Sequence, residues 1–226
     1  SETHKLAFDF EKKTRQNGVE AGRLNGNPVH QGFIQVVEKR PPDFSINTVV
    51  NKNGSVVDLY CGDWKLSHEK ACEDYGKSHT LKIAEKRDVV IVSCGGNPHD
   101  TNMIQAHKAL EMASHACNPG GKIIFLAKCE DGLGREDFID WFSTANSESL
   151  AERLCQNYKV NGQTAWSLLM KTESFDIEIM TDLPRGQLEK LGLRKILSLE
   201  KALESTAESS GYIVPFGSKF KITAGD

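Results

Sequence analysis

Two apolar runs joined by a helical segment constrain the fold of this chain more than any other feature. Asp88–Cys94 and Lys122–Ala127 have the pattern of strands buried on both faces of a parallel sheet. Between them, Thr101–Cys117 has helical composition, with Asp100 placed to cap its start, and Asn118–Gly121 ends it. The sequence therefore predicts a βαβ unit of about 35 residues.

The rest of the C-terminal part alternates between helical and strand patterns. Helices are predicted near Glu136–Phe142, Ser147–Tyr158, Gly162–Thr172, Pro184–Leu191 and Ser198–Ser209, and strands at Phe175–Met180 and Tyr212–Val214. This alternation predicts an α/β fold with a mostly parallel, Rossmann-like sheet over residues 80–226. The polar stretch Ser78–Thr80 is the predicted domain boundary.

A smaller α+β segment is predicted before that boundary, over residues 1–79. A glycine-rich loop leads into a predicted helix at Val29–Arg40, and a second helix is predicted at Trp64–Lys77. The β-branched runs Phe44–Val50 and Ser55–Cys61 are joined through Asn53-Gly54, which supplies the positive φ of a tight turn. These two runs therefore predict a β-hairpin.

Charge and composition exclude two classes of function. The 226 residues include 28 Lys and Arg against 31 Asp and Glu, so no basic surplus favours a nucleic-acid partner. No apolar run approaches the roughly 20 residues that span a bilayer, and the first residues lack the pattern of a signal peptide. Six cysteines without a CxxC pair are interpreted as reduced core residues of a cytoplasmic protein.

The first candidate site follows the strand that ends at Cys94. Open α/β sheets bind ligands at this position, and Gly95, Gly96 and Asp100 form the turn into the next helix. The amides of that helix's first turn and its dipole attract a carboxylate or phosphate. Gln105 and Lys108 share one helix face at a spacing of three and could hold a small anion. The alternative is a glycine-rich connector with a solvated lysine.

The second strand end, Ala127–Gly134, has a similar loop composition, and we expect the two loops to face each other across neighbouring strands. A dinucleotide is a weak alternative ligand because GxGxxG is absent. His68 and Cys72 could ligate a soft metal at a spacing of four, but packing explains them more simply. Trp166 is interpreted as a core aromatic or as the wall of a cleft.

Several segments taken together resemble the nickel-pincer lactate racemase family, specifically its C-terminal half. They are Gly22–His30, the Phe44–Val50 strand with Asn47, Ser93–Asn102, Gln105–Ala109, and Gly120–Ile124 running into Cys129–Gly132. The resemblance extends from about Glu20 to Lys171 and, more loosely, to Val214–Gly217.

The resemblance implies a two-domain enzyme with an active site between its domains, in which residues 1–79 form the C-terminal part of the first domain and residues 80–226 the C-terminal domain. In this family a nickel pincer derived from nicotinic acid accepts the C2 hydride of a 2-hydroxy acid and returns it to either face. Gln105 and Lys108 would contact anionic groups of substrate or cofactor, with Gly95, Gly96 and Asp100 in the same turn, and Trp166 would be the family's aromatic pocket residue.

The chain also departs from the family pattern. The histidine pair that acts as general acid and base, and the lysine that tethers the cofactor, belong to the N-terminal half. A nickel-binding histidine would fall at His4, and Ile104 stands where an aromatic commonly precedes the glutamine, which weakens the expectation of lactate as substrate.

We therefore expect half an active site. On this expectation the chain lacks the cofactor and does not racemise hydroxy acids by itself, because its partner is the missing N-terminal domain. The alternative is a stand-alone α/β anion-binding module without catalytic activity.

Overall fold

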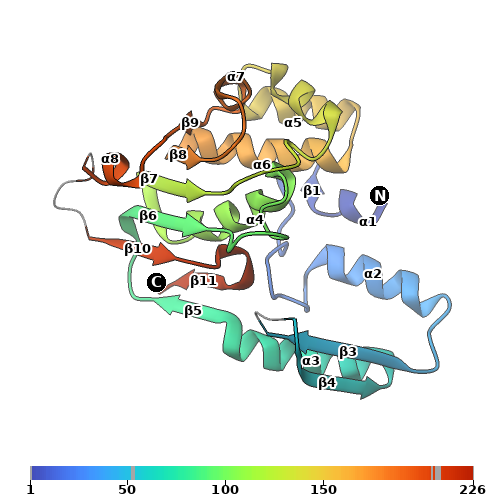
Figure 1. Ribbon diagram of the computed structural model, residues 1–226. Coiled ribbons are helices and arrows are strands. Elements are labelled where there is room, and N and C mark those ends of the chain that lie inside the picture. Colours follow the sequence, from blue (N-terminus) through green and yellow to red (C-terminus); the bar gives the residue numbers. More distant parts are fainter. Residues whose placement is uncertain (1, 52–53, 205, 207–209, 226) are drawn as a thin grey trace. The chain divides into compact units, whose positions relative to one another are not determined.

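The structure of the protein is a computed structural model and describes residues 2–51, 54–204, 206 and 210–225 (Figure 1). The chain divides into two compact units, Ser1–Thr80 and Leu81–Asp226, and each is described by itself. Among the described residues, no helix is both long enough and apolar enough to cross a membrane.

Within the described residues, unit 1 is built from helices and two antiparallel strand pairs. Its elements are α1 (Glu2–Lys5), β1 (Phe8–Asp9), β2 (Thr14–Arg15), α2 (Pro28–Glu38), β3 (Ser45–Val50), β4 (Val56–Gly62) and α3 (Trp64–His79). The predicted hairpin is confirmed, since β3 pairs antiparallel with β4 and Ile46 lies opposite Cys61. Gly54 has the expected positive φ of 80°, whereas Asn53 of the predicted turn lies outside the described residues.

Side-chain caps fix where the two long helices of unit 1 begin. The Asn27 carboxamide accepts hydrogen bonds from the backbone N–H groups of Val29 and His30 at the start of α2. Asp63 does the same for Lys65 and Leu66 at the start of α3. Caps of this kind satisfy helix amides that have no partner within the helix. They explain why both helices begin close to the predicted positions.

A parallel sheet forms the centre of unit 2, as the apolar runs predict. Within the described residues it has five strands in the order β10-β6-β7-β8-β9, with all four pairings parallel. The strands are β6 (Arg87–Ser93), β7 (Cys117–Leu126), β8 (Asp176–Met180), β9 (Arg194–Lys195) and β10 (Gly211–Val214). The carboxyl end of β6 therefore lies between the carboxyl ends of β7 and β10 (Figure 1).

Helices make up much of the rest of unit 2, and some of them pack directly on this sheet. They are α4 (Met103–Ser114), the 3₁₀ helix η1 (Glu136–Ser143), α5 (Ser147–Gln156), α6 (Val160–Ser174), α7 (Arg185–Lys190), α8 (Leu199–Glu204) and the 3₁₀ helix η2 (Gly217–Lys219). Helix α4 contacts β6, β7 and α6, and α6 contacts β8. Val90, Val92 and Phe125 are completely buried. Burial of each such side chain contributes about 1.5–3 kcal/mol, so the two predicted strands anchor the core.

The predicted helix between these strands has different ends in the structure. Helix α4 begins at Met103 with Asn102 as its cap, so the prediction that Asp100 caps it is wrong. The helix ends at Ser114, and Cys117 already belongs to β7, where it pairs with Arg87. The glycine-rich stretch that was predicted to stop the helix lies inside β7 instead, next to an irregularity in the β6–β7 register.

Short strands complete the fold. Within the described residues β5 (Thr80–Ile83) and β11 (Lys221–Ala224) form a separate two-stranded sheet. The sequence pattern did not predict β1, β2, β5, β9 or β11, which contain two to four residues each. The predicted helix Ser198–Ser209 is described only as α8, because residues 205 and 207–209 lie outside the described part.

Candidate functional site

The candidate site of unit 2 is built on two loops that follow neighbouring strands. Backbone hydrogen bonds join the loop after β6 to the loop after β7: Cys129 N donates to Asp100 O at 2.9 Å, and Asp131 N donates to Thr101 O at 2.8 Å. A third bond, 3.1 Å long, runs from Met103 N to Gly132 O. These bonds confirm the prediction that the two loops face each other, and they fix the position at which α4 begins.

Asp100 holds the two loops together. Asp100 is only 8% exposed, and its Oδ2 accepts a hydrogen bond of 3.0 Å from the backbone N–H of Lys128. A carboxylate bonded to a backbone amide in this way satisfies a buried donor that would otherwise be costly. The structure therefore gives Asp100 a supporting function in the loops rather than the helix-capping function that the sequence suggested.

The N-terminus of α4 is less open to an anion than the sequence suggested. Asn102 Oδ1 accepts a hydrogen bond of 3.0 Å from Gln105 N, while Met103 N is bonded to Gly132 O. Two of the first-turn amides thus already have acceptors within the protein. An anion at this position would have to be held mainly by side chains.

Gln105 and Lys108 are the side chains that can do this. Lys108 Nζ donates a hydrogen bond of 2.7 Å to Gln105 Oε1 on the same face of α4, and Lys108 is exposed. This bond uses the amide oxygen and leaves the amide NH₂ and two ammonium hydrogens as further donors. Neighbouring donors of this kind, one of them charged, suit a carboxylate or a phosphate oxygen.

The two glycines of the β6 loop have different surroundings. Both adopt the left-handed conformation, with φ of 89° at Gly95 and 81° at Gly96. A Cβ on Gly95 would lie 2.4 Å from Cδ1 of Phe216, whereas a Cβ on Gly96 would meet nothing within 4 Å. The absence of a side chain at Gly95 therefore allows Phe216 to pack against the backbone, whereas at Gly96 it leaves open space.

Phe216 is a site-forming residue that the sequence analysis did not identify as such. It follows β10, and the order of the sheet places β10 beside β6, so its ring reaches the Gly95 turn. The neighbouring Gly217 is equally constrained, since a Cβ there would lie 2.6 Å from Val92 and 3.0 Å from Ala109. The only signal in the sequence was the Val214–Gly217 segment, which lies more than 110 residues from Gly95.

Trp166 lies on α6 and is 4% exposed. This burial favours the interpretation of Trp166 as a core aromatic over that of a cleft wall. Gly162 on the same helix packs closely against another tryptophan, because a Cβ there would lie 2.7 Å from the ring of Trp141. Aromatic packing thus anchors α6 within unit 2.

The cysteines of unit 2 near the strand ends are buried. All six cysteines lie among the described residues and carry free thiols, but the interpretation of all six as core residues is wrong, because Cys61 is exposed and Cys72 and Cys155 are half-buried. Burial raises the pKa of Cys117 and the pKa of Cys129 to about 11. Burial also raises the pKa of Cys94 strongly. These three thiols stay protonated near neutral pH, so none of them is suited to act as a nucleophile.

The histidines that the sequence singled out are packed against other side chains. Both ring nitrogens of His68 lie 3.7–3.8 Å from Cys72 Sγ, and the ring of His30 stacks on that of His68 with centroids 5.5 Å apart. The ring of His4 meets Phe33 edge-on with centroids 5.9 Å apart. Within the described residues, no three histidine, cysteine or acidic side chains are grouped so that they could hold a metal ion.

Comparison with known proteins matches most of unit 2 to one family. Residues 83–214 match the family described as the lactate racemase C-terminal domain. A lactate racemase of Thermoanaerobacterium thermosaccharolyticum is 36% identical over 121 residues, which are 54% of this chain and 28% of that protein. A lactate racemase of Lactiplantibacillus plantarum is 31% identical over 117 residues, which are 52% of this chain and 27% of that protein.

Two solved structures resemble most of the chain. The lactate racemase apoprotein from T. thermosaccharolyticum matches with a TM-score of 0.85 and 25% identity, covering 97% of this chain and 54% of that chain. A protein from Thermotoga maritima matches with a TM-score of 0.64 and 19% identity, covering 88% of this chain and 54% of that chain, and shows the fold alone. The chain thus spans about half the length of these solved relatives.

Proposed function

This chain belongs to the lactate racemase C-terminal domain family, and from that premise we propose that it supplies the anion-holding part of a racemase or epimerase of 2-hydroxy acids. The observation that carries the proposal is the Gln105–Lys108 pair on α4, beside two loops that backbone hydrogen bonds hold together. We further propose that this chain is part of a longer protein that also contains a counterpart of the N-terminal half of its relatives, and that protein is called the full-length protein below.

In this proposal the pair binds the carboxylate that all 2-hydroxy acids share. The Lys108 ammonium supplies a charged hydrogen bond and the Gln105 amide supplies a second donor, which together fix the orientation of the acid. Their mutual hydrogen bond holds both side chains on one face of α4 before the ligand arrives. Binding then orders fewer side chains than it would if each moved independently.

The nickel pincer implied by the family fits this chain only in part. The donors of Gln105 and Lys108 suit an anionic group of such a cofactor. The described residues contain no grouped set of ligands that fits the nickel ion itself. We therefore derive no step through the metal. The resemblance places one nickel-binding histidine at His4, and we assign the remaining ligands to the other half of the full-length protein.

The groups that exchange the proton of the substrate are also assigned to the other half. A general acid and base must lie within hydrogen-bond reach of the proton that they transfer. Among the titratable side chains at the ends of β6 and β7, Asp100 is bonded to the backbone of Lys128, and Cys94 and Cys129 are buried thiols with raised pKa, so these three are unsuited to the task. The chain itself is thus expected to bind an acid without converting it.

A turnover assay tests the proposal. The full-length protein, isolated with its cofactor, should interconvert the D and L forms of at least one acid in a series that begins with lactate and continues to larger side chains. The 226-residue chain should give no turnover with the same acids. Turnover by the 226-residue chain, or no turnover of any acid by the loaded full-length protein, would contradict the proposal.

A further inference from the structure

One face of the β3–β4 hairpin in unit 1 is apolar and exposed. The face, called the outer face below, is formed by Ile46, Thr48, Val50, Val56, Val57, Leu59 and Cys61. Ile46 is 63% exposed and Leu59 is 60% exposed, and the three valines are each more than half exposed. Single exposed apolar residues are common on protein surfaces, but a contiguous group marks an interaction site.

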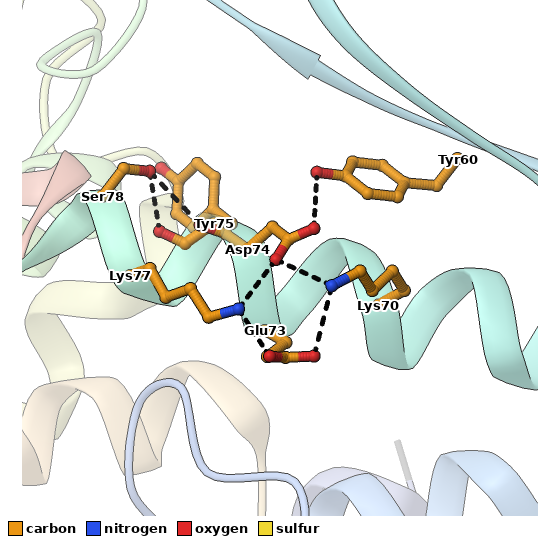
Figure 2. Close-up of polar contacts among 7 residues, drawn as sticks. All are labelled: Tyr60, Lys70, Glu73, Asp74, Tyr75, Lys77 and Ser78. Carbon is orange, nitrogen blue, oxygen red and sulfur yellow. Dashed lines mark hydrogen bonds and ion pairs between the residues drawn. The ribbon is translucent and has the colours of Figure 1, made fainter.

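The opposite face of the hairpin, which packs on α3, is largely polar, although Val49 also lies on it. Ser45 Oγ lies 2.8 Å from Ser67 Oγ, and Asn47 Nδ2 donates to the same Ser67 oxygen at 3.0 Å. Figure 2 shows Tyr60 reaching from β4 to Asp74 on α3, with a hydrogen bond of 3.3 Å to Asp74 Oδ2. Hydrogen bonds from Lys70 and Lys77 lower the pKa of Asp74.

The polarity of the hairpin is therefore reversed. An antiparallel sheet with one face in water places its apolar side chains toward the protein and its polar side chains toward the solvent. Here Ser45, Asn47 and Tyr60 face the protein, whereas Ile46 and Leu59 face outward. Such a pattern is expected of a sheet whose second face is also covered.

The strand edges lead to the same conclusion. Within the described residues this sheet contains two strands, so β3 and β4 each have one edge without a neighbouring strand. Two-stranded sheets are marginally stable, and exposed apolar edges promote association with other chains. A third strand or a further layer would remove both liabilities.

We propose that the outer face is the surface on which the other half of the full-length protein docks. The solved lactate racemase matches 97% of this chain, yet this match covers only 54% of that protein. A little under half of the relative thus lies outside the matched part and supplies the occupant. The occupant is an apolar surface of that half, packed on Ile46 and Leu59 as the next layer of the same domain. The inference rests on the proposed function because both require the other half.

Cys61 provides a direct probe of this docking. Its thiol is exposed on the outer face, whereas those of Cys94, Cys117 and Cys129 are buried in unit 2. We expect iodoacetamide to label Cys61 of the 226-residue chain rapidly, and to label Cys61 of the full-length protein at least tenfold more slowly, as peptide mass spectrometry can measure. Cys94 is the internal control and should stay slow in both.

Equal labelling rates of Cys61 in the two proteins would overturn the proposal. So would slow labelling of the 226-residue chain that speeds up on dilution, because that result would assign the outer face to a second copy. The measurement requires no turnover. A full-length protein that protects Cys61 but racemises no acid would refute the proposed function and leave the docking surface standing.

A charge substitution gives an independent test. In the full-length protein, Ile46→Lys should lower the melting temperature by several degrees because it buries an unpaired charge. The control is Ile213→Lys on β10, where the isoleucine is 75% exposed. In the 226-residue chain both substitutions should leave the melting temperature nearly unchanged. Equal small effects of both substitutions in the full-length protein would contradict docking on the outer face.

Discussion

The carboxylate of Asp100 accepts a hydrogen bond of 3.0 Å from the backbone N–H of Lys128, and this bond joins the loops that follow two neighbouring strands. The bond lies in a buried position, beside backbone bonds between the same two loops. The start of α4, and with it Gln105 and Lys108, is positioned by these contacts between residues about 30 positions apart in the chain.

Removal of the Asp100 carboxylate is expected to destabilise unit 2. Asp100→Ala leaves the Lys128 amide without its acceptor, which costs about 1–3 kcal/mol in the free energy of unfolding. Asp100→Asn keeps an acceptor oxygen and should cost less. Urea unfolding of the three proteins measures the difference. Equal stability of wild type and Asp100→Ala would show that the bond contributes nothing.

Gly95 and Gly96 should respond differently to alanine. Both substitutions place a Cβ at positive φ, which costs about 1 kcal/mol or more. Gly95→Ala also forces a contact of 2.4 Å with Phe216, whereas Gly96→Ala meets nothing within 4 Å. Gly95→Ala should therefore lower the melting temperature more than Gly96→Ala does. The opposite order would mean that Phe216 does not pack against Gly95.

The sequence predicted the parts of the fold that rest on local patterns. Continuous apolar runs indicated β6 and β7, and the Asn-Gly turn indicated the β3–β4 hairpin. Strands of two to four residues, such as β5 and β9, are too short to show a period, and they are defined by pairing with distant segments.

Contacts between distant residues also explain the errors. Asp100 and Asn102 are both good helix caps, and the bond from Met103 N to Gly132 O is among the long-range contacts that fix the helix start. The packing of Phe216 on Gly95 depends on the position of β10 beside β6, which no local pattern reveals. The Gln105–Lys108 contact was predictable because both residues lie on one helix.

A buried ion pair between α4 and α6 is expected to be important for stability. Lys171 Nζ forms an ion pair with Glu111 and donates to Ser167 Oγ at 2.9 Å, and Lys171 is buried. Lys171→Ala leaves the Glu111 carboxylate without this cation and should cost about 3–5 kcal/mol. The double variant Lys171→Met with Glu111→Gln should cost less. Chemical denaturation measures both, and a harmless Lys171→Ala would contradict the importance of the pair.

The buried thiols predict a loss of stability at alkaline pH. Burial raises the pKa of Cys117 and Cys129 from the ordinary value of 9.0 to about 11. A group whose pKa is raised by folding stabilises the folded state fully below its unfolded pKa, and this contribution is lost as the pH rises through the folded pKa. The melting temperature should therefore fall between about pH 9 and pH 11, and Cys129→Ala should reduce the slope. An unchanged slope in that variant would contradict this assignment.

The measurement that tests the central claim most directly is kcat/KM of the full-length protein with and without the Lys108 ammonium. Lys108→Ala should lower kcat/KM about 10- to 150-fold, because a charged hydrogen bond to the carboxylate is lost. This corresponds to a loss of about 1.5–3 kcal/mol in transition-state stabilisation. Lys108→Arg should not restore it, since a planar guanidinium does not replace a compact ammonium. Gln105→Ala should also lower kcat/KM.

The control Lys190→Ala, at an exposed lysine of α7, should leave kcat/KM unchanged. All four melting temperatures should stay close to that of the wild type. Unchanged kcat/KM in Lys108→Ala would show that Lys108 is a solvated surface residue and would contradict the assignment of the anion-holding site.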